Sequence, residues 1–502
     1  MKKILYTIVL YLRIVSSLSG QGKEAYNWIL GYLPDPNFPV SYLGGTWVNF
    51  GTGKPDTSRF VTDAGMYTSG TMSDDKGNLL FYSNGCRVYN SKHEMMPNGD
   101  VLGGPGEVFE CCCNDPLFRA GHYAQWMIAL PWPKNPQQYK LIQAWQTELF
   151  KTSDLLLEAT IDMKLESGLG DVTEKNKLIS SGTQYTNFFV ANRHGNGVDW
   201  WLTIPEWRTK RYFVFLLDSL GIHAPDIQEI SALTNSTGFG QAAFSPDGTK
   251  YAEACFFQGQ VMDFDRCTGK FSNPRVIQFD TSGANSRAGV AFSPDSRYLY
   301  VARFDSLYQY DMRGADFNST RQTVAYFDGV GDSTGLRNPF FYTMLLAPDD
   351  KIYMNTPSST KALHVINYPN EKGVACGFQK WGLELPTFHY GQMPNLPNFR
   401  LGAVDPPCGS GACDTLPVTE TFTVFPNPAT EYIVVSNKKS EMASPLTFKL
   451  YDALGRLLIE EKMDCLPHRV ELRDLPAAGY FYRVFQTNGG SLGNGTFIKV
   501  QK

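Results

Sequence analysis

A turn motif that recurs along most of the chain restricts the fold more than any other feature of the sequence. Its clearest copies are Ser245-Pro246-Asp247-Gly248, Ser293-Pro294-Asp295-Ser296 and Ala347-Pro348-Asp349-Asp350. Proline presets φ for the first turn position, and aspartate can accept a hydrogen bond from the backbone that follows, so each copy predicts a reversal between two strands. With weaker copies included, the turns centre on residues 75, 135, 196, 247, 295 and 349, at intervals of 60, 61, 51, 48 and 54 residues.

A repeat of this length has room for four short strands and their turns, which is the content of one β-propeller blade. One repeat predicts strands at residues 241–245, 250–256, 260–265 and 274–279, and the next at 288–293, 298–303, 306–311 and 321–326. Strand-like runs at residues 46–50 and 383–389 lie outside the six turns. Because an unpaired edge would invite aggregation, we predict a composite closing blade that takes strands from both ends. The predicted fold is all-β: a seven-bladed propeller with six blades plus this closing blade. An array of β-sandwiches is the alternative, although it needs about twice this period.

The rest of the chain divides into three further segments. Residues 1–20 combine a basic start, a short apolar run and small polar residues, which predicts a secretory signal peptide. The propeller then occupies residues 21–405, and a Pro- and Gly-containing linker follows at 406–420. Residues 421–502 hold seven short alternating runs, at 421–425, 432–436, 446–451, 457–462, 469–472, 479–486 and 496–500, which predict a small seven-stranded β-sandwich.

Charge and cysteine content exclude several function classes. The formal net charge is −4 and no Lys/Arg run is present, so we expect no nucleic-acid partner. No run is long and apolar enough to predict a transmembrane segment. The ten cysteines of an exported chain predict disulfides of undetermined connectivity. Cys111, Cys112 and Cys113 would point alternately up and down a strand, which favours disulfides over a metal site. We therefore expect no bound metal and no cofactor.

The C-terminal segment resembles the sorting domain of cargo proteins of the Bacteroidetes type IX secretion system. Four motifs carry the resemblance: Phe425-Pro426-Asn427-Pro428-Ala429, Leu450-Tyr451-Asp452-Ala453-Leu454-Gly455-Arg456-Leu457-Leu458, Leu475-Pro476-Ala477-Ala478-Gly479-Tyr480-Phe481-Tyr482-Arg483-Val484 and Phe497-Ile498-Lys499-Val500-Gln501-Lys502. The resemblance implies that the type IX machinery is a partner through this domain, and that the protein is secreted or attached to the outer cell surface. The residues it points to as the sorting signal are Pro426, Asn427, Pro428, Gly455, Arg456, Gly479, Lys499 and Lys502.

The propeller segment resembles a family of large secreted Bacteroidetes proteins that carry the same tail and are described only as propeller-like. The shared stretches are Gly77-Asn78-Leu79-Leu80-Phe81-Tyr82-Ser83-Asn84-Gly85-Cys86, His93-Glu94-Met95-Met96-Pro97-Asn98-Gly99-Asp100, Asp199-Trp200-Trp201 and Pro394-Asn395-Leu396-Pro397-Asn398-Phe399-Arg400-Leu401-Gly402. This resemblance strengthens the fold prediction and implies no activity. Residues 395–400 are expected to fasten the ring, since two prolines fix an extended path there.

Nothing in the sequence announces catalysis, because a nucleophile elbow, a zinc-binding helix and a phosphate-binding loop are all missing. The best candidate ligand contact is the Gly-rich hairpin that carries Arg193, His194, Asp199, Trp200 and Trp201. Aromatic faces stack on sugars or side chains, although adjacent tryptophans face opposite sides of a strand, so at least one is expected in the core.

These observations favour a non-enzymatic extracellular propeller that binds a protein or glycan. An extracellular glycan hydrolase or lyase is the first alternative, and a surface adhesion or structural component is the second. Carboxylates and basic groups converging on one mouth of the ring would favour an enzyme, and a flat aromatic rim would favour binding.

Overall fold

The structure is a computed structural model. It describes residues 22–501 apart from 33–41, 63–64, 67–68, 105, 115–124, 149–151, 234–239, 256–257, 280–287, 391–392, 406, 409–421, 438–445, 464–465 and 487–490. The predicted signal peptide, most of the predicted linker and Lys502 lie outside these residues. The chain divides into two compact units, Met1–Ala403 and Val404–Lys502, named below the body and the tail domain.

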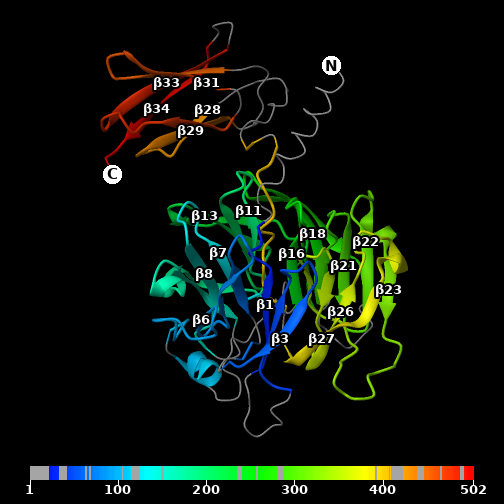
Figure 1. The fold of residues 1–502 in the computed structure, drawn as a ribbon. Coiled ribbons are helices and arrows are strands. Elements are labelled where there is room, and N and C mark those ends of the chain that lie inside the picture. Colours follow the sequence, from blue (N-terminus) through cyan, green and yellow to red (C-terminus); the bar gives the residue numbers. More distant parts are fainter. Residues whose placement is uncertain are drawn as a thin grey trace, which may run out of the picture. The chain divides into compact units, whose positions relative to one another are not determined.

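The described part of the body contains seven antiparallel sheets that follow one another along the chain (Figure 1). The first two sheets are β1 (Asn27–Gly31), β2 (Gly45–Asn49), β3 (Asp56–Phe60), and β4 (Gly70–Ser73), β5 (Leu79–Ser83), β6 (Val88–Asn90). The third and fourth are β7 (Met127–Pro131), β8 (Gln138–Trp145), β9 (Ser153–Asp162), β10 (Asp171–Tyr185), and β11 (Val190–Arg193), β12 (Trp200–Pro205), β13 (Arg211–Asp218), β14 (Gly221–Ile222), β15 (Asp226–Glu229).

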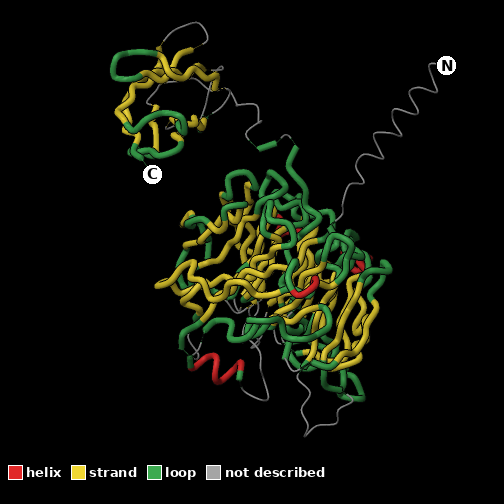
Figure 2. Tube along the Cα trace, turned by 60° about the vertical axis from the view of Figure 1, so that its left-hand side comes forward, coloured by secondary structure: helices red, strands yellow, loops and turns green. Residues whose placement is uncertain are grey.

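The last three sheets of the body have four strands each. They are β16 (Gly240–Phe244), β17 (Lys250–Cys255), β18 (Gly259–Asp265), β19 (Lys270–Ile277); β20 (Ala288–Phe292), β21 (Tyr298–Arg303), β22 (Ser306–Asp311), β23 (Gln322–Tyr326); and β24 (Met344–Leu346), β25 (Ile352–Met354), β26 (Thr360–Ile366), β27 (Phe378–His389). The helical elements are single turns: η1 (Phe109–Cys113), η2 (Glu166–Gly168), η3 (Phe317–Thr320) and η4 (Gly373–Cys376). Strands therefore dominate the trace, as Figure 2 shows.

Hydrophobic cores join each sheet of the body to its neighbours along the chain. One core lies between the first and second sheets, and another joins the second, third and fourth. Further cores lie between the fourth and fifth, the fifth and sixth, and the sixth and seventh sheets. The first and last sheets share one as well, in which Trp28 packs edge-on against Tyr353 with ring centroids 5.6 Å apart. This pattern follows from the sequence, because a strand with alternating apolar residues buries one face against each adjacent sheet.

The structure confirms the all-β, propeller-like architecture. In both repeats whose strands were predicted, each predicted strand coincides with an observed one to within four residues, and β21 and β22 match at both ends. Each aspartate of the Pro-Asp turns accepts a hydrogen bond from the backbone nitrogen two residues later, as expected. Asp247, Asp295 and Asp349 accept from residues 249, 297 and 351 at 2.9, 3.1 and 3.3 Å.

The predicted composite closing blade is wrong for the described strands. Residues 46–50 fall in β2, which pairs with β1 and β3, whereas residues 383–389 fall in β27, which pairs with β26. The two strands lie in neighbouring sheets and contact each other through side chains and one loop. Thr46 Oγ1 lies 2.6 Å from Thr387 Oγ1, and the Phe388 N–H donates to Tyr42 O at 2.7 Å.

The cysteine triplet does not lie on a strand, which corrects the geometry assumed for it. Phe109–Cys113 forms a π-helical turn, and this turn brings Cys113 to Cys86. Disulfides join Cys86 to Cys113 and Cys111 to Cys112. Cys267 and Cys408 each take part in a disulfide as well. Within the residues that the structure describes, no helix is both long and apolar enough to span a membrane.

The tail domain has the seven strands that the sequence predicts. They are β28 (Phe422–Phe425), β29 (Tyr432–Asn437), β30 (Leu446–Tyr451), β31 (Leu457–Met463), β32 (His468–Glu471), β33 (Ala478–Gln486) and β34 (Ser491–Lys499). One sheet has the order β28-β29-β32 and the other β31-β30-β33-β34. Both sheets contribute to a hydrophobic core of its own, which includes Ile433, Val470, Phe448 and Val484.

Candidate ligand-binding site

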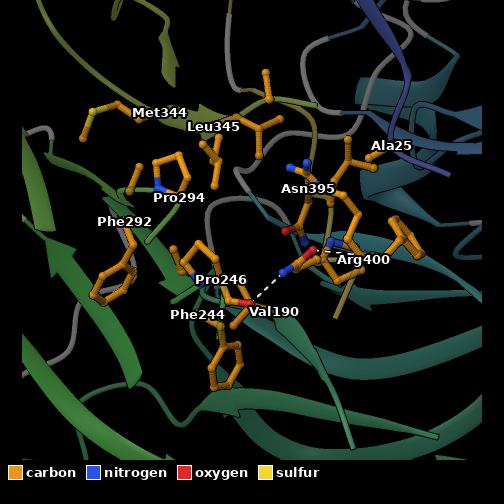
Figure 3. A pocket seen from close by; sticks show the side chains of 18 of the residues that line it. Ala25, Val190, Phe244, Pro246, Phe292, Pro294, Met344, Leu345, Asn395 and Arg400 are labelled. Atoms are coloured by element: carbon orange, nitrogen blue, oxygen red, sulfur yellow. Dashed lines mark hydrogen bonds between the residues drawn. The ribbon is translucent and has the colours of Figure 1, made fainter. Parts of the chain in front are cut away.

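A cavity of about 550 Å³ lies inside the body, beside the first strands of four consecutive sheets. β11, β16, β20 and β24 contribute to its wall, and residues 394–400, named the inner strap, form the opposite side. Figure 3 shows Asn395 and Arg400 of the inner strap facing Pro246, Pro294 and Leu345. The rings of Phe244 and Phe292 point away from the cavity, because they belong to the cores between sheets.

The rim of the cavity is built from the recurring Pro-Asp turns. Gly248, Ser296 and Asp350 occupy the same turn position, with φ of 73°, 59° and 60°, so the three turns present equivalent backbone. The carboxylate of Asp247 is held by Ser245 and Thr249, and that of Asp295 by Ser293 and Arg297. Asp350 forms an ion pair with Arg400 of the inner strap at 3.2 Å. The rim charges therefore hold the turns and the strap in place.

Side-chain amides tie the first strands of the sheets to one another. The Gln125 amide exchanges two hydrogen bonds with the backbone of Ala242, at 2.7 and 2.8 Å. Gln241 Oε1 accepts from Val290 N at 3.1 Å and from Met344 N at 2.8 Å, and its Nε2 donates to Met344 O. Each amide bonds to backbone N–H and C=O groups that would otherwise stay unpaired, because these strands lie at the inner edge of their sheets.

The inner strap is fastened to several sheets by its own asparagines. Asn395 is buried, and its Nδ2 donates to Met127 O at 2.9 Å and to Phe189 O at 2.8 Å. Asn398 Nδ2 donates to Pro246 O at 2.7 Å. The strap therefore contacts the third, fourth and fifth sheets, and through Arg400 the turn of the seventh. The predicted role of residues 395–400 was to fasten the ring, and these contacts support that role.

Two of the five residues predicted as a ligand contact, Arg193 and Trp200, touch the inner strap at Phe399. Among the described residues around the cavity, none of the five contributes to the lining. Trp200 and Trp201 are both buried, in two different cores, so both tryptophans pack inside the body. The guanidinium of Arg193 lies 3.9 Å from the Trp200 ring centroid and donates to Phe399 O at 3.3 Å.

His194 and Asp199 shape the hairpin turn itself. His194 Nδ1 accepts from Asn196 N at 2.9 Å, and Asp199 Oδ2 accepts from Asn196 Nδ2 at 2.6 Å. Burial lowers the pKa of His194 below its ordinary value, and burial lowers the pKa of Arg193 to about 10. These side chains hold the hairpin that supports the strap, and the hairpin's contact with a ligand stays a prediction.

Sequence reasoning missed the residues that surround the cavity. The Pro-Asp turns were recognised only as reversals, and the inner strap only as a fastener. The available signal was the repetition itself, because equivalent turns of successive blades must meet at one mouth of a ring. The described residues contain no cluster of three or more potential metal ligands.

The predicted sorting residues take part in the fold of the tail domain. Pro426, Asn427 and Pro428 follow β28, and Asn427 Oδ1 accepts from Ile498 N at 3.0 Å. Gly455, with φ of 77°, forms the hairpin turn beside Arg456, whose Nε donates to Asp452 at 2.7 Å. Gly479 lies within β33, and Lys499 is buried, with its ammonium donating to the carbonyls of residues 473 and 475.

Residues 423–493 match the protein family described as "Secretion system C-terminal sorting domain". No curated protein matches the chain. The chain is therefore an exported β-protein of two modules, a propeller-like body and a tail domain. The tail domain is a type IX secretion sorting domain, and the protein is secreted or carried on the outer cell surface.

Several solved structures resemble the chain at low sequence identity. A protein from Lactobacillus plantarum is 11% identical with a TM-score of 0.44, over 73% of this chain and 97% of that chain. A provisionally named 6-phosphogluconolactonase from Bacteroides uniformis is 12% identical with a TM-score of 0.43, over 74% and 98%. PorZ, a surface component of the type-IX secretion system of Porphyromonas gingivalis, is 11% identical with a TM-score of 0.29, over 91% and 68%. Similarities this low carry no conclusion about the activity of this chain.

Proposed function

We propose that the protein is a closed, seven-bladed propeller on the outer cell surface that binds an extracellular protein or glycan in its cavity. The ring closes by packing rather than by a shared blade. The support is the shared core between the first and last sheets, together with the contact between Thr46 and Thr387. A ring closed in this way keeps the mouth of the cavity rigid, which is what a recognition site requires.

The cavity itself is the observation that carries the binding proposal. Its size falls within the range of small-ligand sites, and it has an apolar wall with a few polar groups at the rim. Asp247 and Asp295 are engaged in their own turns, and Asp350 is paired with Arg400. Carboxylates bound in this way support recognition rather than acid–base catalysis, so we propose a non-enzymatic protein. A surface adhesion role would use the same cavity.

The test is a binding screen of the purified full chain against arrays of glycans and extracellular proteins, with a polysaccharide-turnover screen beside it. Arg400→Glu places a second carboxylate next to Asp350, and we expect it to weaken binding at least tenfold, about 1.4 kcal/mol. Arg313→Glu changes an exposed arginine outside the cavity lining and should leave binding unchanged. Equal effects of both variants would exclude the cavity as the binding site. Turnover of any substrate above the blank would establish the hydrolase or lyase alternative instead.

A further inference from the structure

The four-stranded sheet of the tail domain has two faces of different character. Its inner face carries Leu446, Phe448, Tyr482 and Val484, which are buried in the core. Successive side chains on a strand point to opposite faces, so the residues between these belong to the outer face. That outer face has no strand or core of the described tail domain packed on it.

Apolar side chains form a row across this outer face. Tyr451 on β30 pairs directly with Leu457 on β31 and with Phe481 on β33. Ile498 on β34 lies one diagonal step further, because Phe481 pairs with Thr496. Directly opposed side chains lie within about 5.5 Å and diagonal ones within about 8 Å, so the row is continuous. Tyr451, Leu457, Phe481 and Ile498 are named the tail patch.

The tail patch exposes apolar surface that the domain's own fold does not use. Leu457, Phe481 and Ile498 are 47%, 50% and 54% exposed. Seven of the twenty large hydrophobic side chains exposed among the described residues belong to the much smaller tail domain. Contiguous exposed apolar residues mark interaction sites, since scattered ones need no explanation but a row does.

Charged residues border the tail patch on one side. The next row of the same face consists of Glu460, Lys449 and Arg483, in direct register. Lys449 pairs with Glu460 at 3.1 Å. Arg483 is exposed, and within the described tail domain no ion pair engages its guanidinium. A partner that covers the tail patch therefore gains if it places a carboxylate opposite Arg483.

We propose that the tail patch is the surface by which a protein of the export machinery binds this chain. The partner presents an apolar strip flanked by a carboxylate. The patch lies on the domain that addresses the protein for export, and three of its four residues fall inside the matched segment. The proposal rests on the sorting role of the tail and is independent of the ligand cavity.

The size of the tail patch favours this partner over a second copy of the chain. The three half-exposed side chains, with the partly buried Tyr451, cover on the order of 400 Å². A stable dimer needs about 800 Å² on each partner. A small apolar surface with one charged flank suits a contact that forms and then releases, which a transported protein requires.

The first experiment measures export of the full chain from a bacterium that has a type IX system. Phe481→Ser and Phe481→Asp should each lower the fraction outside the cells at least tenfold, with the chain retained inside. Phe481→Leu keeps the apolar surface and should restore export. Thr423→Asp adds a charge to the outer face of the other sheet and is the matched control, expected to export normally. Unfolding temperatures of the purified variants show that each one is folded.

A second measurement identifies the partner in cells. A photo-reactive phenylalanine analogue at position 481 should form an adduct with a protein whose deletion blocks export, and the same analogue at position 423 should not. Normal export of Phe481→Asp would overturn the proposal. An adduct of position 481 with a second copy, or with the body of the same chain, would overturn it as well. Ligand binding by the body should be equal in all variants, so failure here is distinguishable from failure of the cavity proposal.

Discussion

Replacing Asn395 by leucine tests whether the inner strap holds the body together. The Asn395 side chain is 5% exposed and donates to two buried carbonyls, those of Met127 and Phe189. Leucine has a similar volume and no donor, so both acceptors lose a partner without a large cavity forming. A buried acceptor left unpaired costs about 1–3 kcal/mol, so we expect the free energy of unfolding to fall by about 2–6 kcal/mol. For a body of nearly four hundred residues this corresponds to a melting temperature lower by roughly 2–7 °C.

Calorimetry of the purified full chain measures this effect, because the tail domain has its own core and is unchanged by the substitution. Asn398→Ala is the matched control. It removes the hydrogen bond from a half-buried amide to Pro246 O and one from the exposed Arg400 N–H, which water replaces, so it should cost only about 0.5–1.5 kcal/mol. If Asn395→Leu melts no lower than Asn398→Ala, the strap does not fasten the sheets and the interpretation of its contacts fails.

Two further predictions concern a turn and a buried histidine. Gly248→Ala should destabilise the body by at least about 1 kcal/mol more than Gly53→Ala, as measured by urea unfolding. Both glycines have positive φ. A Cβ at Gly53 would meet no neighbour, whereas a Cβ at Gly248 would lie 2.7 Å from Arg266 Cδ. Equal losses would contradict the crowding. Burial lowers the pKa of His364 to about 4 from an ordinary 6.5, so the unfolded chain binds a proton that the folded chain does not between these pH values. The free energy of unfolding should therefore fall by about 2–3 kcal/mol between pH 7 and 4.5 because of this histidine. In the His364→Gln variant, the fall in unfolding free energy over the same range should be smaller by this amount. Parallel pH profiles of the two proteins would refute this.

Local features of the fold could be read from the sequence because their causes are local. Proline and aspartate fix the turns within four residues, and alternation fixes the strands between them, so β21 and β22 were predicted at their observed bounds. The seven strands of the tail domain were found for the same reason. Alternation says which face of a strand is buried, but it does not say which strand lies beside it.

The errors concern contacts between residues far apart in the sequence. The runs at residues 46–50 and 383–389 were equally able to pair with each other or with their chain neighbours. In the structure each run pairs with its neighbours along the chain, and the first and last sheets meet through packed side chains. The π-helical turn at Phe109–Cys113 has no sequence signal that separates it from a short strand.

The candidate site was only partly accessible to sequence reasoning. The sequence indicates Arg193 and Trp200 as parts of a candidate ligand contact, but it gives no sign of their contact with the inner strap, since Phe399 lies about two hundred residues away. From the sequence alone, Asn395 is predicted only to be an extended residue next to a proline. Its two hydrogen bonds appear only when the third and fourth sheets are in place.

The position of the inner strap in the chain order affects which translation products reach the surface. Residues 394–400 are among the last of the body to leave the ribosome, and the tail domain follows them. A polypeptide truncated anywhere before the strap lacks both the segment that completes the interior of the body and the domain that addresses it for export. We therefore expect that incomplete bodies are not secreted, because they lack the sorting domain.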